Sequence, residues 1–186
     1  MRGVRAAPAA LALLLAACAT VADRRAERPA SEAGVAFDAA GERGSYAVGL
    51  ADPAAGRALS VDDPVRVASI SKLAVAIGVM KLVEQGQLDL GRDVSLYLGW
   101  SLRNPTYPDW PITLRHLLGH SSGLRDGDDI YVIPLGGSLR ETMAKPEAWG
   151  AGHAPGRYFT YANLNFPVVA SIVERVTRER FDLWIS

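Results

Sequence analysis

Ser69-Ile70-Ser71-Lys72 is the central motif of the sequence, because it places a serine three residues before a lysine and opens a long apolar segment. The segment that follows, LAVAIGVMKLVEQ at 73–85, is rich in helix formers, and Gly86 stands where a C′ glycine is expected. We predict a helix with Ser69 in its first turn. Residues i and i+3 share one helix face, so the Ser69 hydroxyl and the Lys72 amine can share a hydrogen bond.

This spacing has a chemical meaning. A serine hydroxyl is a weak nucleophile at neutral pH and needs an unprotonated base beside it. Burial in apolar surroundings lowers the pKa of a lysine amine, and the apolar residues around Lys72 predict a buried helix. The positive end of that helix would also stabilise negative charge that develops at Ser69. The alternative is structural, with Ser69 as an N-cap and Lys72 as a surface lysine.

The first 17 residues are predicted to be an export signal. Residues 1–5 are basic, and residues 6–17 are apolar but too few to span a bilayer. The segment ends in Leu15-Ala16-Ala17-Cys18, which resembles a bacterial lipoprotein box with Cys18 as the lipidation site. Cys18 is the only cysteine, so no internal disulfide is possible. The alternative is an ordinary cleaved signal with an incidental cysteine.

Residues 18–33 are polar, charged and without apolar periodicity, so we expect a flexible tether before a domain over 34–186. In the lipoprotein resemblance, Ala19 after the cysteine favours the bacterial outer membrane, with the domain facing the periplasm. The chain carries 20 basic and 20 acidic residues, and the basic ones are scattered among acids. Nothing in this pattern indicates a nucleic-acid partner.

Short elements surround the serine motif. Apolar runs at 45–50 and 58–61 flank a turn cluster at 51–57, which predicts a β-hairpin. Short helices are predicted within 112–124, N-capped by Thr113, and over 139–143, and an amphipathic helix over 164–176. A strand pair that leads into a buried helix predicts a mixed α/β layer.

Two further features allow structural and functional interpretations. Tyr161 and Asn163 precede the amphipathic helix, where Asn163 could be the N-cap and Tyr161 a core residue. His116 and His120 stand four apart and could bind a metal, but Gly119 weakens the helix between them. No third ligand follows with zinc-site spacing. We therefore expect structural histidines and no metal site.

Five stretches in one order resemble the serine β-lactamase and penicillin-binding superfamily. The likeness is to its class C-like branch, which includes D-Ala-D-Ala carboxypeptidases and related esterases. The stretches are residues 67–72, 82–90, 112–124, 155–156 and 161–163, and the resemblance covers about residues 34–186. It implies a β-lactamase/transpeptidase-like fold of the α/β (α+β) class, in which a helical region packs on an antiparallel sheet.

The resemblance also implies roles for four residues. Ser69 would be the nucleophile that forms an acyl-enzyme, and Lys72 its activating base. Tyr161 would be the second acid/base, and Asn163 would hydrogen-bond the substrate amide or hold Lys72. The substrate would be a β-lactam, a D-Ala-D-Ala peptide of peptidoglycan or a small ester, with no metal or organic cofactor.

One motif of the superfamily, Lys-Thr-Gly or His-x-Gly on a later strand, does not follow Asn163 in this sequence. That strand would supply one of two backbone N–H groups of the oxyanion hole. Because the chain ends early, we expect an incomplete sheet and exposed apolar surface on the central helix. The alternatives to an active hydrolase are an inactive, truncated lipoprotein remnant and a structural envelope lipoprotein. The sequence leaves the substrate and the oligomeric state open.

Overall fold

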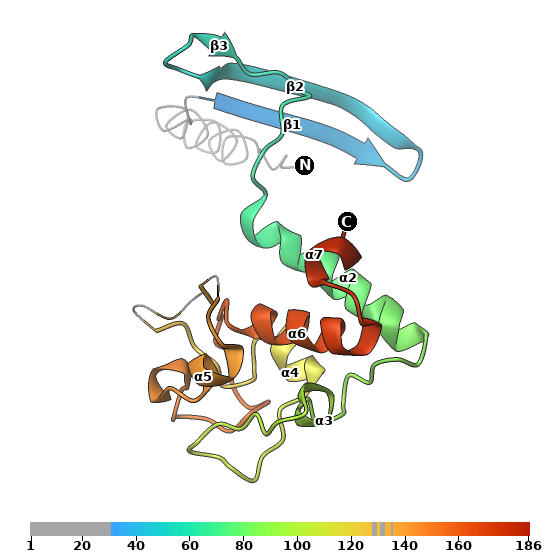
Figure 1. Ribbon diagram of the computed structural model, residues 1–186. Helices are drawn as coiled ribbons and strands as arrows, with labels where there is room; N and C mark the ends of the chain where they lie inside the picture. Colours follow the sequence, from blue (N-terminus) through green and yellow to red (C-terminus); the bar gives the residue numbers. More distant parts are fainter. Residues whose placement is uncertain (1–30, 128–129, 131–132, 135) are drawn as a thin grey trace, which may run out of the picture. The chain divides into compact units, whose positions relative to one another are not determined.

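The computed structural model describes residues 31–127, 130, 133–134 and 136–186 (Figure 1). Its contacts divide the chain into two units, a sheet unit within residues 1–66 and a helical unit over 67–186. The predicted export signal, Cys18 and the first part of the predicted tether lie outside the described residues. The first strand begins at Ser31, so residues 31–33 belong to the sheet and not to the tether.

The sheet unit is a three-stranded antiparallel sheet in the order β1-β2-β3. The strands are β1 (Ser31–Asp38), β2 (Gly41–Asp52) and β3 (Arg57–Ala58). The predicted hairpin corresponds to β2 and β3, although β3 has two residues only. No sequence pattern predicts β1, because its residues SEAGVAFD show no regular alternation of large apolar and polar side chains.

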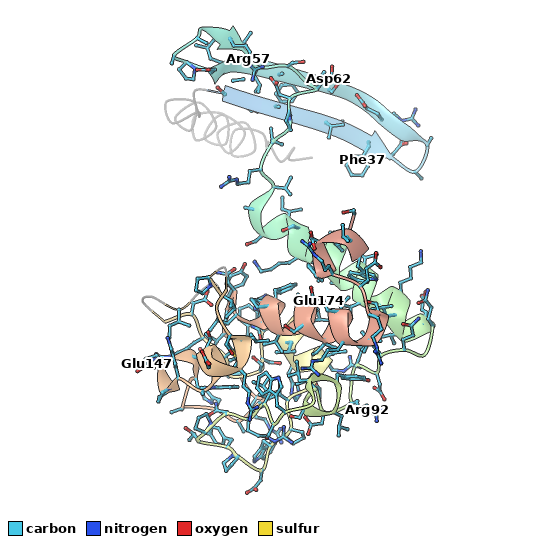
Figure 2. The ribbon with its side chains drawn as sticks, viewed as in Figure 1. Phe37, Arg57, Asp62, Arg92, Glu147 and Glu174 are labelled. Atoms are coloured by element: carbon cyan, nitrogen blue, oxygen red, sulfur yellow. The ribbon has the colours of Figure 1, made fainter. Side chains whose placement is uncertain are left out.

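The sheet unit adds nothing to the buried apolar core of the described residues, which lies in the helical unit. Phe37, labelled on β1 in Figure 2, is 75% exposed. Val48 on β2 is exposed as well. The residues of the candidate site, described below, therefore all depend on the helical unit for their packing.

The helical unit contains the predicted helices and several short ones. Its elements are η2 (Ala68–Ile70), α2 (Ser71–Glu84), α3 (Ser95–Leu98), α4 (Leu114–Leu118), α5 (Leu139–Met143), η3 (Pro146–Ala148), α6 (Asn165–Thr177) and α7 (Phe181–Trp184). Helix α6 packs against α3, α4 and α7. The predicted helices after the serine motif, within 112–124, over 139–143 and over 164–176 are confirmed. No helix in the described parts of the chain has the length and apolar character needed to cross a bilayer.

Two glycines shape α2. Gly86 follows the last turn with φ of +71°, as predicted for a C′ residue. Gly78 lies in the middle of the helix, where glycine costs about 1 kcal/mol relative to alanine. A Cβ at Gly78 would lie 2.5 Å from the ring of Trp184. The close approach of α7 to α2 therefore explains the glycine.

Helix α2 buries one face only. Val75, Val79 and Leu82 are buried in the core, and their spacing of four and three residues forms a single row along the helix. Leu73 and Ile77, outside that row, are more than half exposed. The predicted burial of this helix therefore holds for one row only, because only that row meets the core of the helical unit. The predicted exposed apolar surface on this helix is confirmed.

Candidate active site

Ser69 and Lys72 meet where η2 runs into α2. Lys72 Nζ donates a hydrogen bond to Ser69 Oγ at 3.0 Å. Ser69 lies in the 3₁₀ turn η2 and not in the first turn of α2, yet the spacing of three residues still brings the two side chains together. Val67 is the N-cap of η2 and Ile70 that of α2, so Ser69 caps neither helix.

Ser69 also meets Tyr161, which stands 92 positions later in the sequence. Ser69 Oγ and Tyr161 Oη are 2.7 Å apart, and either hydroxyl can donate. Tyr161 is 45% exposed, so the interpretation of this side chain as a core residue is wrong. The serine oxygen therefore lies between an amine and a phenol, and both serine and tyrosine are open to solvent.

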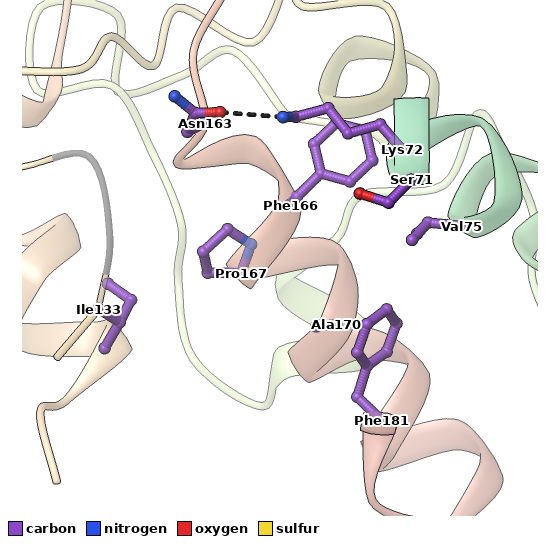
Figure 3. Close-up of a pocket in the computed structure, with 9 residues that line it drawn as sticks. All are labelled: Ser71, Lys72, Val75, Ile133, Asn163, Phe166, Pro167, Ala170 and Phe181. Carbon is purple, nitrogen blue, oxygen red and sulfur yellow. Dashed lines mark hydrogen bonds between the residues drawn. The ribbon is translucent and has the colours of Figure 1, made fainter. Parts of the chain in front are cut away.

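Asn163 completes the group. Its Oδ1 accepts a hydrogen bond from Lys72 Nζ at 2.9 Å, drawn as a dashed line in Figure 3. Leu164, and not Asn163, is the N-cap residue of α6. The structure thus brings together four of the five site residues named from the sequence, while Cys18 lies outside the described residues.

Two residues outside the predicted site support this group: Asp126, which no sequence pattern indicated, and His120, which was expected to be a structural histidine. Asp126 Oδ2 accepts from the backbone N and from Nδ2 of Asn163, at 2.9 and 2.8 Å. His120 Nδ1 accepts from the backbone N of Ala162 at 3.2 Å. The His120 ring also stacks on Tyr161, with 4.4 Å between ring centroids. The sequence signal for both residues was weak. His120 lies within 112–124, one of the five stretches of the resemblance, and Asp126 lies two residues after the end of that stretch.

The two histidines have separate surroundings. Burial, and after it the charge of Lys72, lowers the pKa of His120, which favours the neutral ring. Burial also lowers the pKa of His116, whose Nδ1 lies 3.4 Å from the backbone N of Thr113 in a capping box. Within the ranges that the structure describes, no three histidine, cysteine or acidic side chains form a group that could hold a metal ion.

The acidity of Tyr161 provides a test of the site's electrostatics. Lys72 is the main cause that holds the pKa of Tyr161 below its usual value, and the hydrogen bond with Ser69 is the second. Because a lowered pKa means that the phenolate forms at lower pH, we expect Tyr161 to ionise below pH of about 10. Lys72→Met should raise this midpoint. Ultraviolet titration of the phenolate, taken as the difference from Tyr161→Phe in each background, measures it, and equal midpoints with and without Lys72 would contradict the assignment.

A pocket of about 660 Å³ opens beside Lys72 and Asn163 (Figure 3). Its walls are mostly apolar and come from α2, α6, α7 and the segment before α5. The lining side chains other than Lys72 and Asn163 are Ser71, Val75, Ile133, Phe166, Pro167, Ala170 and Phe181. The Lys72 amine also lies 5.3 Å from the centre of the Phe166 ring. The lysine therefore has apolar surroundings on the side away from Ser69.

The chain is similar to known proteins over most of its length. Residues 15–186 match the Beta-lactamase family. Esterase EstB of Burkholderia gladioli is 33% identical over an alignment of 149 residues, and the match covers 70% of this chain and 37% of that protein. The octameric penicillin-binding protein homologue from Pyrococcus abyssi has a TM-score of 0.70 and 26% identity, over 92% of this chain and 41% of that one.

A further solved structure, EstCE1, a hydrolase with promiscuous acyltransferase activity, has a TM-score of 0.69 at 22% identity. The likeness covers 92% of this chain and 49% of EstCE1. The chain therefore spans less than half the length of these three relatives. The likeness confirms the predicted β-lactamase/transpeptidase-like fold with an incomplete sheet. Together with the match over residues 15–186, it shows that the chain belongs to the Beta-lactamase family.

Proposed function

We propose that the chain carries the nucleophilic half of a serine hydrolase that acts through an acyl-enzyme on Ser69. The observation that supports this proposal most directly is the position of Ser69 Oγ, 3.0 Å from Lys72 Nζ and 2.7 Å from Tyr161 Oη. A nucleophile within hydrogen-bond reach of its base, with the base held by a third group, is the arrangement that covalent catalysis requires.

The proposed reaction has two steps. Lys72, as the neutral amine, takes the Ser69 proton while Oγ forms a bond to the carbonyl carbon of the substrate. Tyr161 then gives its proton to the leaving group as the bond from that carbon breaks, which leaves the acyl group on Ser69. Water attacks the acyl carbon and gives a proton to the Tyr161 phenolate. The Lys72 ammonium returns its proton to Ser69 Oγ as the acid is released.

Asn163 is proposed to hold Lys72 and not to bind the substrate amide. Its Oδ1 is engaged by Lys72 Nζ and its Nδ2 by Asp126. An asparagine amide offers one acceptor oxygen and two N–H donors, so little of the group is left to recognise a substrate. This favours one of the two roles that the family resemblance left open.

The substrate class is proposed from the relatives and the pocket. One relative, from Burkholderia gladioli, is named as an esterase, and one solved structure as a penicillin-binding protein homologue. Small esters, β-lactams and D-Ala-D-Ala peptides of peptidoglycan therefore remain the candidate substrates. Because the pocket beside Lys72 is largely apolar, an acyl group with an apolar substituent is favoured among them.

The N-terminal sequence supports a location in the bacterial cell envelope. The basic and apolar start that ends in Leu15-Ala16-Ala17-Cys18 supports export and lipidation at Cys18. With Ala19 next, the proposed site is the outer membrane with the domain facing the periplasm. We expect Cys18→Ala to move the exported protein from the membrane fraction to the soluble periplasmic fraction. An unchanged membrane fraction would contradict the lipid anchor.

Covalent labelling tests the proposed reaction. A fluorescent alkyl fluorophosphonate and a fluorescent penicillin are each incubated with the purified chain, and the adduct is located by peptide mass spectrometry. The fluorophosphonate should form one Oγ–phosphorus bond at Ser69 with loss of fluoride, and the penicillin one acyl ester at the same residue. Folded protein that takes neither label would support the inactive alternative.

A further inference from the structure

We propose that Asp126 is a positioning residue that fixes which end of the Asn163 side-chain amide faces Lys72. This inference rests on the proposed function of the site. Asp126 belongs neither to the serine motif nor to the segment around Tyr161, and it comes from the loop that follows α4. Its carboxylate is half-buried beside the start of α6.

Three donors converge on the Asp126 carboxylate. Oδ2 accepts from the Asn163 backbone N at 2.9 Å and from Asn163 Nδ2 at 2.8 Å. Oδ1 accepts from the backbone N of Leu164 at 3.2 Å. An ionised carboxylate can only accept hydrogen bonds, so it can pair with the Nδ2 end of the Asn163 amide but not with the Oδ1 end.

The orientation of the amide decides what Lys72 meets. With Nδ2 on Asp126, the opposite end, Oδ1, faces Lys72 Nζ at 2.9 Å and accepts its hydrogen bond. A flipped amide would direct N–H groups at the amine, and an ammonium has three donors and no acceptor. A flip would therefore leave the ammonium that forms when Lys72 takes the Ser69 proton without its acceptor, and with N–H groups facing it. Asp126 acts on Ser69 through two intermediates, Asn163 and Lys72.

The same loop holds the Tyr161–Asn163 segment at a second point. His120 Nδ1 accepts from the Ala162 backbone N, and the His120 ring stacks on Tyr161. The polar and ionisable groups that surround Lys72 are therefore Ser69, Tyr161 and Asn163 in direct contact, with His120 and Asp126 behind them. Of these groups, Asp126 is the one carboxylate, and it accepts hydrogen bonds from both the backbone and the side chain of Asn163.

A purely structural role, in which Asp126 only caps the start of α6, makes a different prediction. Asp126→Asn keeps the size of the side chain but introduces N–H donors where the carboxylate only accepted. If Asp126 positions the amide, the Asn163 side-chain resonance in a ¹⁵N–¹H spectrum should shift and its hydrogen exchange should accelerate. The rate of Ser69 acylation by the fluorophosphonate, per folded molecule, should fall about ten- to a hundredfold. A capping role alone would lower the melting temperature and leave the acylation rate per folded molecule unchanged.

Asp93→Asn is the matched control. Asp93 is also half-buried and also accepts a backbone N–H at the start of a helix, from Ser95 at 3.0 Å, but its partners are Ser95 and Arg103. Asp93→Asn should lower the melting temperature but leave the Asn163 amide resonance and the acylation rate unchanged. Asp126→Glu, which keeps an acceptor-only group, should recover part of the acylation rate lost in Asp126→Asn.

The proposal is overturned if Asp126→Asn leaves the Asn163 amide resonance or the acylation rate per folded molecule as in the wild type. If Asp126→Asn does not fold, acid titration of the wild-type chain decides instead. The Asn163 amide resonance should move in the same step as the Asp126 carboxyl carbon, and independent movement would overturn the proposal. Wild-type protein that takes no label would refute the proposed function, while the amide resonance would still decide the role of Asp126.

Discussion

Ser69→Ala should abolish covalent labelling by both the fluorophosphonate and the penicillin, while the protein stays folded. The reason is chemical, because alanine has no atom that can form the bond to phosphorus or to the acyl carbon. Ser69 is exposed, and its Oγ contacts Lys72 and Tyr161 at the surface of the helical unit. Loss of this hydroxyl should therefore change stability by no more than about 1 kcal/mol. Fluorescence of the labelled band and intact mass measure the loss.

The control for this change is Ser101→Ala, an exposed serine in the loop after α3. It should label at the wild-type rate, since its hydroxyl belongs to no contact of the site. If Ser69→Ala still took one equivalent of label, the nucleophile would be another residue and the proposed reaction would be wrong.

Lys72→Met should lower the rate of Ser69 acylation by about 10²- to 10⁴-fold, the range that a positioned general base contributes. Methionine keeps most of the length and the apolar character of the lysine stem, but it has no amine and so loses the contact of Nζ with the Phe166 ring. The change removes the one amine that contacts Ser69 Oγ in the described structure. It also leaves Asn163 Oδ1 without its donor, which should cost about 1–3 kcal/mol of stability. Stopped-flow or gel-based labelling at several reagent concentrations gives the rate constant.

Lys81→Met is the matched control, because it makes the same chemical change in the last turn of the same helix. Lys81 is exposed, and it lies in the last turn of α2 whereas Lys72 lies in the first. Surface substitutions usually change stability by less than about 0.5 kcal/mol, so Lys81→Met should stay folded. Because Lys81 takes no part in the contacts of Ser69, we expect the labelling rate of this variant to stay within about twofold of the wild type. Equal losses in both variants would show that net charge, and not a base at Ser69, sets the rate.

The local half of the site could be predicted from the sequence alone. A spacing of three residues brings the side chains of Ser69 and Lys72 together in a 3₁₀ turn as well as in an α-helix. Ser69 lies in η2 and not in the predicted first turn of α2, and the hydrogen bond between the two side chains forms all the same. The presence of Tyr161 and Asn163 beside them could not follow from spacing. It came from the resemblance, in which the order of five stretches implied a shared pocket.

Other features depend on packing that no pattern in the sequence reveals. Asp126 stands in a polar, glycine-rich loop where an acidic residue is common, and only the fold brings it under Asn163. Helix α2 has apolar residues on all sides, so the sequence could not indicate which row meets the core. Strand β1 pairs with β2 through backbone bonds, and such bonds require no particular side chains.

The separation of the site residues along the chain has a consequence for folding. The Ser69–Lys72 contact spans three positions and can form as soon as one turn winds, whereas the contacts to Tyr161 and Asn163 span 92 and 91 positions. Contacts of such high order form only after a long loop has closed, and they are the slow part of folding. In the proposed reaction Ser69 depends on both kinds of contact, so a newly made chain is expected to keep a serine of ordinary reactivity until Tyr161 and Asn163 have reached it. Under that proposal, labelling of Ser69 would report that these long-range contacts have formed.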